Sequence, residues 1–379
     1  MSKNPLNNSQ ASVPFVDLRT THDPVKDAIV ADIAELFDTS AFSNGPQVAE
    51  FERLFGAFCG SPYCVGLASG LDALKIGLLA GGIEPGDEVI VPANTFAATF
   101  EAVTQAGGIP TVIDVQESDY NLDPQAAESA VTSRTRFVLP VHLYGQMADM
   151  RQLSALASER SLKIIEDACQ AHGAERDGLR AGAVGVVGAF SFYPTKNLGA
   201  IGDAGALVTD DAEVAVHARA LREHGQTAKY RYSYEGYTSR LDTIQAIALL
   251  RKLPLLDRCN HLRRAAASFY SERLHNVGDI RLPPVAEGST SVWHLFVIRT
   301  RDPVALAEFL AQHGIATGRH YPEPPHLSDA YRGLGFRPGA FPITEAISRE
   351  GLSLPLFPGI TEEQLEHVCV SINGFFSGG

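Results

Sequence analysis

The sequence predicts an α/β protein whose main element is a seven-stranded, mostly parallel sheet. Short apolar runs alternate with segments in which apolar residues recur at helical spacing, and this alternation is typical of strands connected by helices. The chain has 379 residues, of which 45% are hydrophobic, so it is long enough for two domains and a sizeable core. The predicted strands are residues 64–67, 88–91, 111–115, 137–141, 163–165, 189–192 and 206–209.

Two helices are predicted ahead of the sheet. One follows Asp23-Pro24 and the other begins at Gly45-Pro46, and in both the apolar residues recur every three or four positions. The first of them carries Val25, Ile29, Ile33 and Leu36, and the second carries Val48, Phe51, Leu54 and Phe55. Residues 1–13 are expected to be disordered, and the large, cofactor-binding domain is expected to span residues 14–250.

A smaller α+β domain is expected to follow over residues 251–379. A long helical region runs from Leu241 to about Leu274, with an interruption near Pro254, and leads out of the large domain. The elements predicted beyond it are a strand at 292–298 and helices at 303–313 and 361–375.

Composition narrows the functional classes. The formal net charge of −13 argues against nucleic acid or an anionic membrane as a partner. The five cysteines contain no Cys-x-x-Cys pair, which argues against a disulfide framework or a zinc site. The first dozen residues are polar, and no apolar run approaches the ~20 residues of a membrane helix. We therefore expect a soluble, cytoplasmic protein with no signal peptide and no metal.

A lysine follows the strand predicted at 189–192. Pro194 ends that strand and places Lys196 on the next turn, close to Ser191 and to several glycines. Only the neutral amine of a lysine attacks a carbonyl group, and removal from water favours the neutral amine by lowering its pKa. A single lysine after a strand is more often a solvated surface charge, so Lys196 needs support from other residues.

That support comes from two other strand ends. Asp167 lies at the end of an apolar run, where an aspartate alone is more often a helix cap. Ser69 and Gly70 open a predicted helix at 72–79, whose N-terminus can bind a phosphate or be capped by Ser69 alone. An imine-forming lysine and a carboxylate facing a pyridinium nitrogen are the two groups that pyridoxal phosphate requires.

Three segments resemble one known family. Glu-Asp-Ala-Cys-Gln-Ala-His-Gly (166–173), Ser-Phe-Tyr-Pro-Thr-Lys-Asn-Leu-Gly (191–199) and Gly-Asp-Ala-Gly-Ala-Leu (202–207) resemble the DegT/DnrJ/EryC1/StrS sugar aminotransferases, which use pyridoxal phosphate. The resemblance extends from about Pro14 to the C-terminal segment. Within the family, residues 68–74, 140–146 and 320–322 are most similar to enzymes that act on nucleotide-linked 3-keto-6-deoxy sugars.

The resemblance implies a homodimeric fold-type I aminotransferase. Lys196 would bind the cofactor covalently and transfer protons, and Asp167 would keep the pyridine nitrogen protonated. The implied phosphate ligands are Ser69, Gly70, Leu71 and Ser191. Phe96 would stack on one face of the cofactor ring, and Gln170 would approach the other face or the phenolic oxygen. The residues implied to face the sugar are Tyr193, His320, Tyr321 and His326. The implied substrates are a dTDP-linked 3-keto-6-deoxyhexose and L-glutamate.

One position departs from the family pattern. Many relatives carry Gly-x-Asn-x-Arg before the long helix, and the asparagine reaches the cofactor phosphate of the second subunit. Here the sequence is Gly236-Tyr237-Thr238-Ser239-Arg240, so a shorter hydroxyl replaces the amide. Thr238 and Arg240 are still expected to serve the second subunit's site.

Three other functions remain open. The chain could instead be a C4 aminotransferase for a 4-keto nucleotide sugar, because C3 and C4 enzymes share their cofactor residues. A cofactor-dependent sugar dehydratase of the same fold would carry histidine at the position of Lys196. A non-catalytic regulatory relative would have no need of Lys196 or Asp167, and this chain has both.

Overall fold

The computed structural model describes residues 12–378, so most of the predicted disordered terminus, residues 1–11, lies outside the described part of the chain. All seven predicted strands are present and form one sheet in the order β1-β9-β8-β5-β4-β2-β3. Their bounds are β1 (Tyr63–Leu67), β2 (Glu88–Pro92), β3 (Ile109–Ile113), β4 (Thr135–Val138), β5 (Lys163–Asp167), β8 (Val187–Ser191) and β9 (Gly205–Thr209). Strand β9 runs in the direction opposite to the other six strands, so the prediction of a mostly parallel sheet is confirmed.

The end of β4 differs from its prediction for a physical reason. The apolar run continues to Val141, but the continuous ladder ends at Val138, and beyond it Val141 forms only an isolated parallel bridge with Asp167 of β5. Pro140 has no N–H to donate, so residues 139–141 stay buried without extending the regular ladder. This buried segment leads directly into the loops beyond the sheet.

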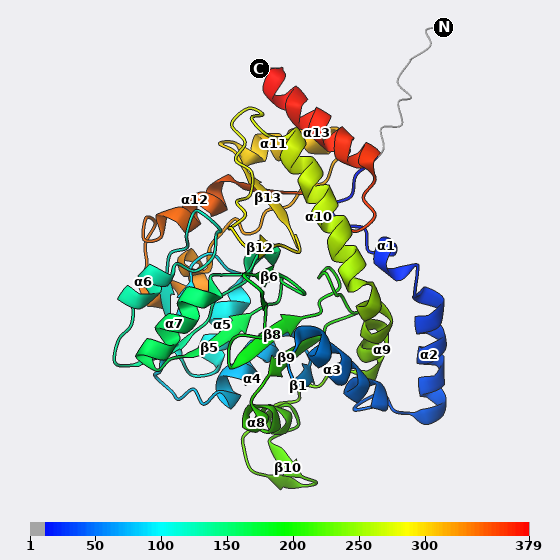
Figure 1. Cartoon of the computed structure of the whole chain (residues 1–379), viewed down its shortest axis with the longest axis vertical. Coiled ribbons are helices and arrows are strands. Elements are labelled where there is room, and N and C mark those ends of the chain that lie inside the picture. Colours follow the sequence, from blue (N-terminus) through cyan, green and yellow to red (C-terminus); the bar gives the residue numbers. More distant parts are fainter. Residues whose placement is uncertain (1–11, 379) are drawn as a thin grey trace.

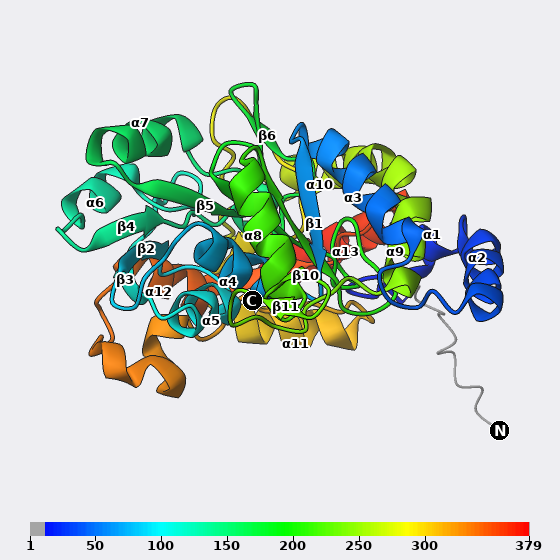
Figure 2. The same cartoon turned by 90° about the horizontal axis from the view of Figure 1, so that it is seen from below.

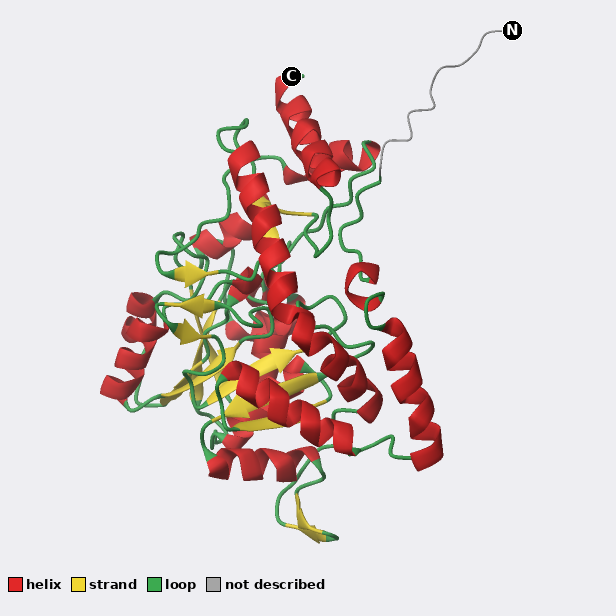
Figure 3. Ribbon diagram, turned by 45° about the vertical axis from the view of Figure 1, so that its right-hand side comes forward, coloured by secondary structure: helices red, strands yellow, loops and turns green. Residues whose placement is uncertain are grey.

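Helices cover both faces of the sheet (Figure 3). Along β2, Val89 and Val91 face one hydrophobic cluster and Ile90 faces the other, as the two-residue period of a strand requires. The first cluster is completed by α4 (Gly70–Ala80), α5 (Ala97–Gln105) and α8 (Ala212–Arg222). The second is completed by α3 (Pro46–Cys59), α6 (Pro124–Ser129), α7 (Met150–Arg160) and α9 (Thr243–Lys252).

The predicted N-terminal helix is α2 (Lys26–Thr39), preceded by the short α1 (Arg19–His22). Ile29 and Leu36 of α2 pack on Ile247 of α9, and α2 lies at the edge of the molecule in two views (Figures 1 and 2). Phe37, the residue after Leu36, is exposed. Helix α2 therefore buries only one stripe within this chain.

The break predicted near Pro254 is η2 (Leu253–Leu255), which separates α9 from α10 (Leu256–Arg273). Helix α10 runs from the sheet to the C-terminal part of the chain (Figure 1). There β13 (Phe296–Arg299) pairs with β14 (Gly351–Leu354), a strand that the sequence did not predict. The helices there are α11 (Pro303–Gln312), α12 (Pro342–Glu350) and α13 (Glu362–Ser377).

The prediction of disorder for residues 1–13 is wrong at Val13. This residue is fully buried among the C-terminal residues and pairs with Ile315. The division into residues 14–250 and 251–379 stays a prediction.

The remaining elements are short. They are β6 (Glu175–Arg176), β7 (Leu179–Arg180), β10 (Gln226–Ala228), β11 (Arg231–Tyr232), β12 (Ser289–Thr290), η1 (Leu143–Gly145), η3 (Pro325–Leu327) and η4 (Asp329–Leu334). Across residues 12–378, no helix combines the length and the apolar character needed to cross a membrane. The same residues contain no group of three side chains arranged to hold a metal ion.

Candidate active site

A pocket of about 400 Å³ lies beyond the carboxyl ends of the parallel strands, where sheets of this kind bind ligands. Loops after β1, β2, β5 and β8 form its walls, and a loop of the C-terminal part closes it. The structure brings together here most of the residues singled out from the sequence: Ser69, Gly70, Leu71, Phe96, Asp167, Gln170, Ser191, Tyr193, Lys196, His320 and Tyr321.

Lys196 is held on a tight turn after β8. Its backbone N–H donates to the carbonyl oxygen of Tyr193 (2.8 Å), and a Cβ at Gly199 would lie only 2.2 Å from the carbonyl oxygen of Pro194. The turn therefore requires glycine at position 199. Desolvation lowers the pKa of Lys196 below 10.5, while Cys169 and Asp167 act in the opposite direction. More of this amine is therefore neutral at a given pH than in a solvated lysine.

Asp167 ends β5 with its carboxylate fixed on both oxygens. Oδ2 accepts from Thr99 Oγ1 (2.9 Å) and Oδ1 accepts from the backbone N–H of Cys169 (3.2 Å). Thr99 Oγ1 also lies 2.6 Å from Thr95 Oγ1. Since Thr99 gives its proton to the carboxylate, Thr95 must donate to Thr99. This chain of hydrogen bonds holds a buried anion in one orientation.

Glu166 precedes Asp167 and faces the opposite side of the strand, in the core. Its carboxylate accepts from the backbone N–H groups of Gly182, Val184 and Gly185 and lies 2.8 Å from His142 Nε2. These contacts hold the loop before β8 against the core-facing side of β5. Successive residues of a strand face opposite sides, so Glu166 has a structural role while Asp167 faces the pocket.

The N-terminus of α4 forms another wall of the pocket. Ser69 caps the helix by accepting from the backbone N–H of Asp72 (3.1 Å). A Cβ at Gly70 would lie 2.6 Å from Ser191 Cβ and 2.8 Å from Cys169 Sγ, so only glycine permits this approach of helix to strand. The free N–H groups and the dipole of this helix favour an anion here, and a phosphate is such an anion.

Pyridoxal phosphate fits the groups that line this one pocket. Helix α4 offers a phosphate site, Lys196 offers an amine of lowered pKa, and Asp167 offers a buried carboxylate. Phe96 and Tyr193 are 54% and 52% exposed, so their rings present free faces to the pocket.

The loop predicted to face the sugar is only partly at the pocket. Tyr321 lies 5.3 Å, centroid to centroid, from the ring of Phe96, and its hydroxyl accepts from Gln170 Nε2 (3.1 Å). His320 Nδ1 lies 2.8 Å from Ser353 Oγ. Burial, with the nearby Lys196, lowers the pKa of His320 to about 4, so this imidazole is neutral at pH 7.

His326 is a correction, because the structure does not place it in the pocket. Its ring is enclosed edge-on by Phe336 and Phe341, and its Nε2 lies 3.4 Å from Glu345. It is 1% exposed, so it cannot contact a sugar without local unfolding. Its nearness in sequence to Tyr321 was a poor guide to the direction of its ring.

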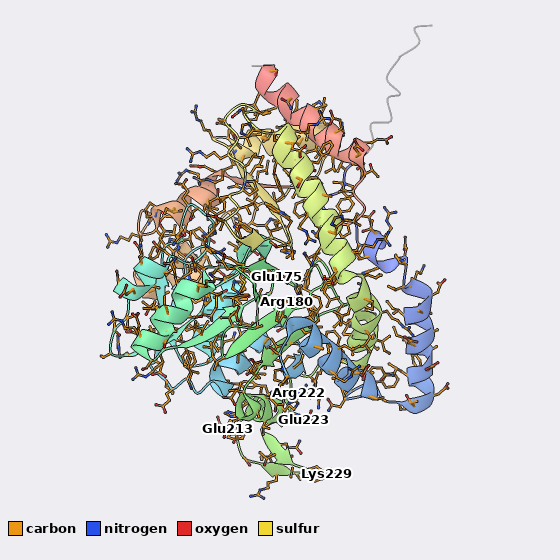
Figure 4. The ribbon with its side chains drawn as sticks, in the orientation of Figure 1. Glu175, Arg180, Glu213, Arg222, Glu223 and Lys229 are labelled. Carbon is orange, nitrogen blue, oxygen red and sulfur yellow. The ribbon has the colours of Figure 1, made fainter. Side chains whose placement is uncertain are left out.

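Thr238 and Arg240 also lie outside the pocket of their own chain. Thr238 Oγ1 contacts the imidazole of His224 (3.2 Å), and Arg240 donates to Glu223 (2.7 Å). Glu223 follows α8, near the hairpin of β10 and β11 that carries Lys229 at its far end (Figure 4). Their role in a second subunit's site stays a prediction.

Three pocket or near-pocket residues were missed. Thr95 and Thr99 follow β2 with the spacing of one helical turn, which is a common pattern without functional meaning on its own. His294 lines the pocket, and burial lowers its pKa well below 6.5. The only sequence signal for His294 was a single polar residue in the apolar run predicted at 292–298.

Comparison with known proteins gives a consistent result. Residues 24–373 match the model of the DegT/DnrJ/EryC1/StrS aminotransferase family. The dTDP-3-amino-3,4,6-trideoxy-alpha-D-glucose transaminase of Streptomyces venezuelae is 44% identical over 360 residues, covering 95% of both chains. The dTDP-3-amino-3,6-dideoxy-alpha-D-galactopyranose transaminase of Aneurinibacillus thermoaerophilus is 42% identical, covering 96% of this chain and 99% of that one. The solved structure of S. venezuelae DesV is similar with a TM-score of 0.94 at 43% identity, covering 96% of this chain and 98% of that one.

Proposed function

Because the chain belongs to the DegT/DnrJ/EryC1/StrS aminotransferase family, it is a pyridoxal-phosphate-dependent sugar aminotransferase, and we propose that it aminates C3 of a dTDP-linked 3-keto-6-deoxyhexose, with L-glutamate as amino donor. The observation that carries the proposal is the meeting of Lys196 and Asp167 in one pocket with the N-terminus of α4. A simple binding protein has no use for a lysine of lowered pKa beside a buried carboxylate.

Each pocket residue then has a distinct task. Ser69, Gly70, Leu71 and Ser191 would hold the phosphate, Asp167 the pyridine nitrogen, and Phe96 and Gln170 the ring. When bound, the cofactor withdraws electrons from the bond that is broken at the substrate carbon. Lys196 Nζ would accept the proton released there and return it to the product. Tyr193, His320 and Tyr321 would contact the sugar.

The assignment of Lys196 can be tested without a sugar. The purified protein should show a visible absorption band, and borohydride should attach the cofactor to the peptide containing Lys196. Lys196→Arg should abolish the adduct. An adduct at the wild-type level in that variant would refute the assignment, and a cofactor-free wild-type protein would favour the regulatory alternative. A sugar dehydratase would carry histidine at this position, so Lys196 argues against that activity.

Asp167 can be tested separately. Asp167→Asn should retain the cofactor and lose nearly all transamination, because a neutral amide does not stabilise a charged pyridinium in a dry site. Unchanged turnover would remove Asp167 from the proposal.

The choice of C3 is supported by the two 3-amino-sugar transaminases that resemble this chain over nearly its full length. C4 amination is the second candidate. Choosing between the two carbons requires a different placement of the hexose at Lys196, and a misplaced carbonyl loses the close approach that the reaction needs. The test offers 3-keto and 4-keto dTDP sugars separately with glutamate and identifies the product by NMR. Amination of the 4-keto sugar alone would overturn the choice of C3.

The assembly and location are also part of the proposal. A homodimer is supported by the exposed Phe37 on α2 and by the position of Arg240 outside its own pocket. A cytoplasmic location is supported by the five cysteines, which are all unpaired. Sedimentation at assay concentration tests the dimer, because an active monomer would contradict it.

A further inference from the structure

A second, smaller cavity adjoins the active-site pocket. Its volume is about 160 Å³, and Thr195, His294 and His320 line both spaces. The rest of the wall consists of apolar side chains and one arginine, Arg263. The cavity therefore borders the site around Lys196, and its lining differs from that site in chemistry.

Arg263 is a buried cation without a counter-ion. It lies on α10 and is 4% exposed. Its Nη1 donates to the carbonyl oxygens of Leu356 (3.0 Å) and Trp293 (3.2 Å), and its buried Nε has no partner. Among residues 12–378 no carboxylate forms an ion pair with it, although buried charges in proteins are normally paired.

Burial also lowers the pKa of Arg263, to about 10, so the side chain stays charged at pH 7 while its desolvation is not offset. The backbone carbonyls fix the guanidinium in place but leave its charge unneutralised. An anion that entered the cavity would supply the negative charge that the protein itself does not.

The other polar groups of the cavity carry no charge. Burial lowers the pKa values of both His294 and His320, so both are neutral at pH 7. His294 Nδ1 lies 3.3 Å from Asn197 Oδ1 and His320 Nδ1 lies 2.8 Å from Ser353 Oγ, which fixes both rings. Thr195 adds a hydroxyl. One cation beside neutral hydroxyl and imidazole groups is suited to a single negative group.

We infer that this cavity is the carboxylate subsite of the amino donor, with Arg263 as its counter-ion. The inference rests on the proposed function in taking the pocket of Lys196 as the reaction centre and an amino acid as the amino donor. A cavity of about 160 Å³ with apolar walls accepts one end of an amino acid but not a nucleotide. The donor and the sugar react in turn at the same lysine, so a separate carboxylate subsite lets one pocket accept two unlike substrates.

The first test measures binding of glutarate, a dicarboxylate without an amine, to the holoenzyme by calorimetry. Arg263→Met should weaken binding by at least about 30-fold, because a charge-assisted hydrogen bond is lost. Arg264→Met is the matched control: Arg264 is the next residue of α10 and lines neither space, so binding should be unchanged. Glutarate bound equally well by Arg263→Met and wild type would overturn the inference, as would absence of binding to the wild type.

The second test divides the reaction into halves. Arg263→Met should slow amino transfer from glutamate to the enzyme, while transfer from the amine-loaded enzyme to the keto sugar keeps its wild-type rate. Equal slowing of both halves would overturn the inference and indicate a structural role. If the enzyme accepts no dTDP sugar but loses glutarate binding in Arg263→Met, the subsite stands and the proposed sugar substrate fails.

A variant that leaves Arg263 intact covers the case in which Arg263→Met does not fold. Val16→Phe should fill the cavity from a partly exposed wall position, and it too should lose glutarate. Retained binding in Val16→Phe would overturn the inference. L-alanine identifies the carboxylate that is bound: if Arg263→Met slows alanine and glutamate equally, Arg263 binds the α-carboxylate, and if it slows glutamate alone, Arg263 binds the side-chain carboxylate.

Discussion

Thr99 Oγ1 donates a hydrogen bond of 2.9 Å to Asp167 Oδ2 across 68 residues of sequence. A carboxylate can only accept, so the direction of this bond is fixed, and Thr95 in turn donates to Thr99. The start of α5 thereby sets the orientation of the carboxylate that the proposed function assigns to the pyridine nitrogen.

Replacing Thr99 should therefore disturb catalysis through Asp167. Thr99→Val removes the donor at similar volume and is expected to lower kcat about 10-fold, because one charge-assisted hydrogen bond is lost. Thr99→Ser keeps the hydroxyl and should restore most of the activity. The pH titration of the cofactor's absorption should shift in the valine variant alone. Equal defects in both variants, with no spectral shift, would indicate a packing role instead.

Much of this architecture is predictable from the sequence because it is local. Each of the seven strands contains a short apolar run, and Lys196 and Asp167 are marked by the strand ends and turn residues beside them. β14 was missed because it is a run of only four residues with a serine in the middle, and its partner β13 lies more than fifty residues earlier in the chain.

The residues that sequence reasoning missed depend on contacts between distant segments. Arg263 sits among other polar residues of a long helix and looks like a surface charge, yet α10 packs so that it is buried. His326 shows the opposite failure. It belongs to the right loop, but its ring packs against Phe341 and does not line the pocket. Loop position does not fix side-chain direction.

Covalent attachment of the cofactor to Lys196 should depend on pH in a defined direction. Only the neutral amine reacts, and desolvation places its pKa below 10.5, so the attachment rate should rise with pH and level off below pH 10.5. Stopped-flow absorbance with the cofactor-free protein measures this rate. N-acetyl-lysine methylamide under the same conditions controls for titration of the cofactor itself. A rate that keeps rising with the same slope as this solvated amine would contradict the prediction.

His172 should make the protein sensitive to acid. It is 0% exposed, and its Nε2 lies 2.9 Å from the carbonyl oxygen of Ser191, to which it donates. Desolvation, with a contribution from Lys196, lowers its pKa from 6.5 to about 3, so between these values the unfolded chain binds the proton and the folded chain does not. The free energy of unfolding should therefore fall as the pH drops below 6.5.

The measurement compares wild type with His172→Gln by urea denaturation. From this group alone, wild type should lose about 2 kcal/mol more than the variant between pH 7 and pH 5, at about 1.4 kcal/mol per pH unit below pH 6.5. Parallel losses in the two proteins would mean that His172 does not titrate on unfolding.

Arg240 should act in the second subunit of a dimer. Within its own chain it is paired with Glu223 and does not line the pocket, so a role at the phosphate requires another copy. Lys196→Ala and Arg240→Ala should each be nearly inactive alone. When their subunits are mixed, half of the dimers combine one of each, and one of the two sites in such a dimer has both an intact Lys196 and an intact partner arginine.

The mixture should therefore recover about a quarter of the wild-type activity, as random pairing in a two-fold dimer requires. Mixing Lys196→Ala with Asp167→Asn is the control, because both residues belong to the same chain's pocket and no intact site can form. Recovery in the first mixture but not in the second would place Arg240 across the interface. If neither mixture recovers although mass spectrometry detects mixed dimers, Arg240 acts within its own chain, and its bond to Glu223 is then the structural contact that the substitution removed.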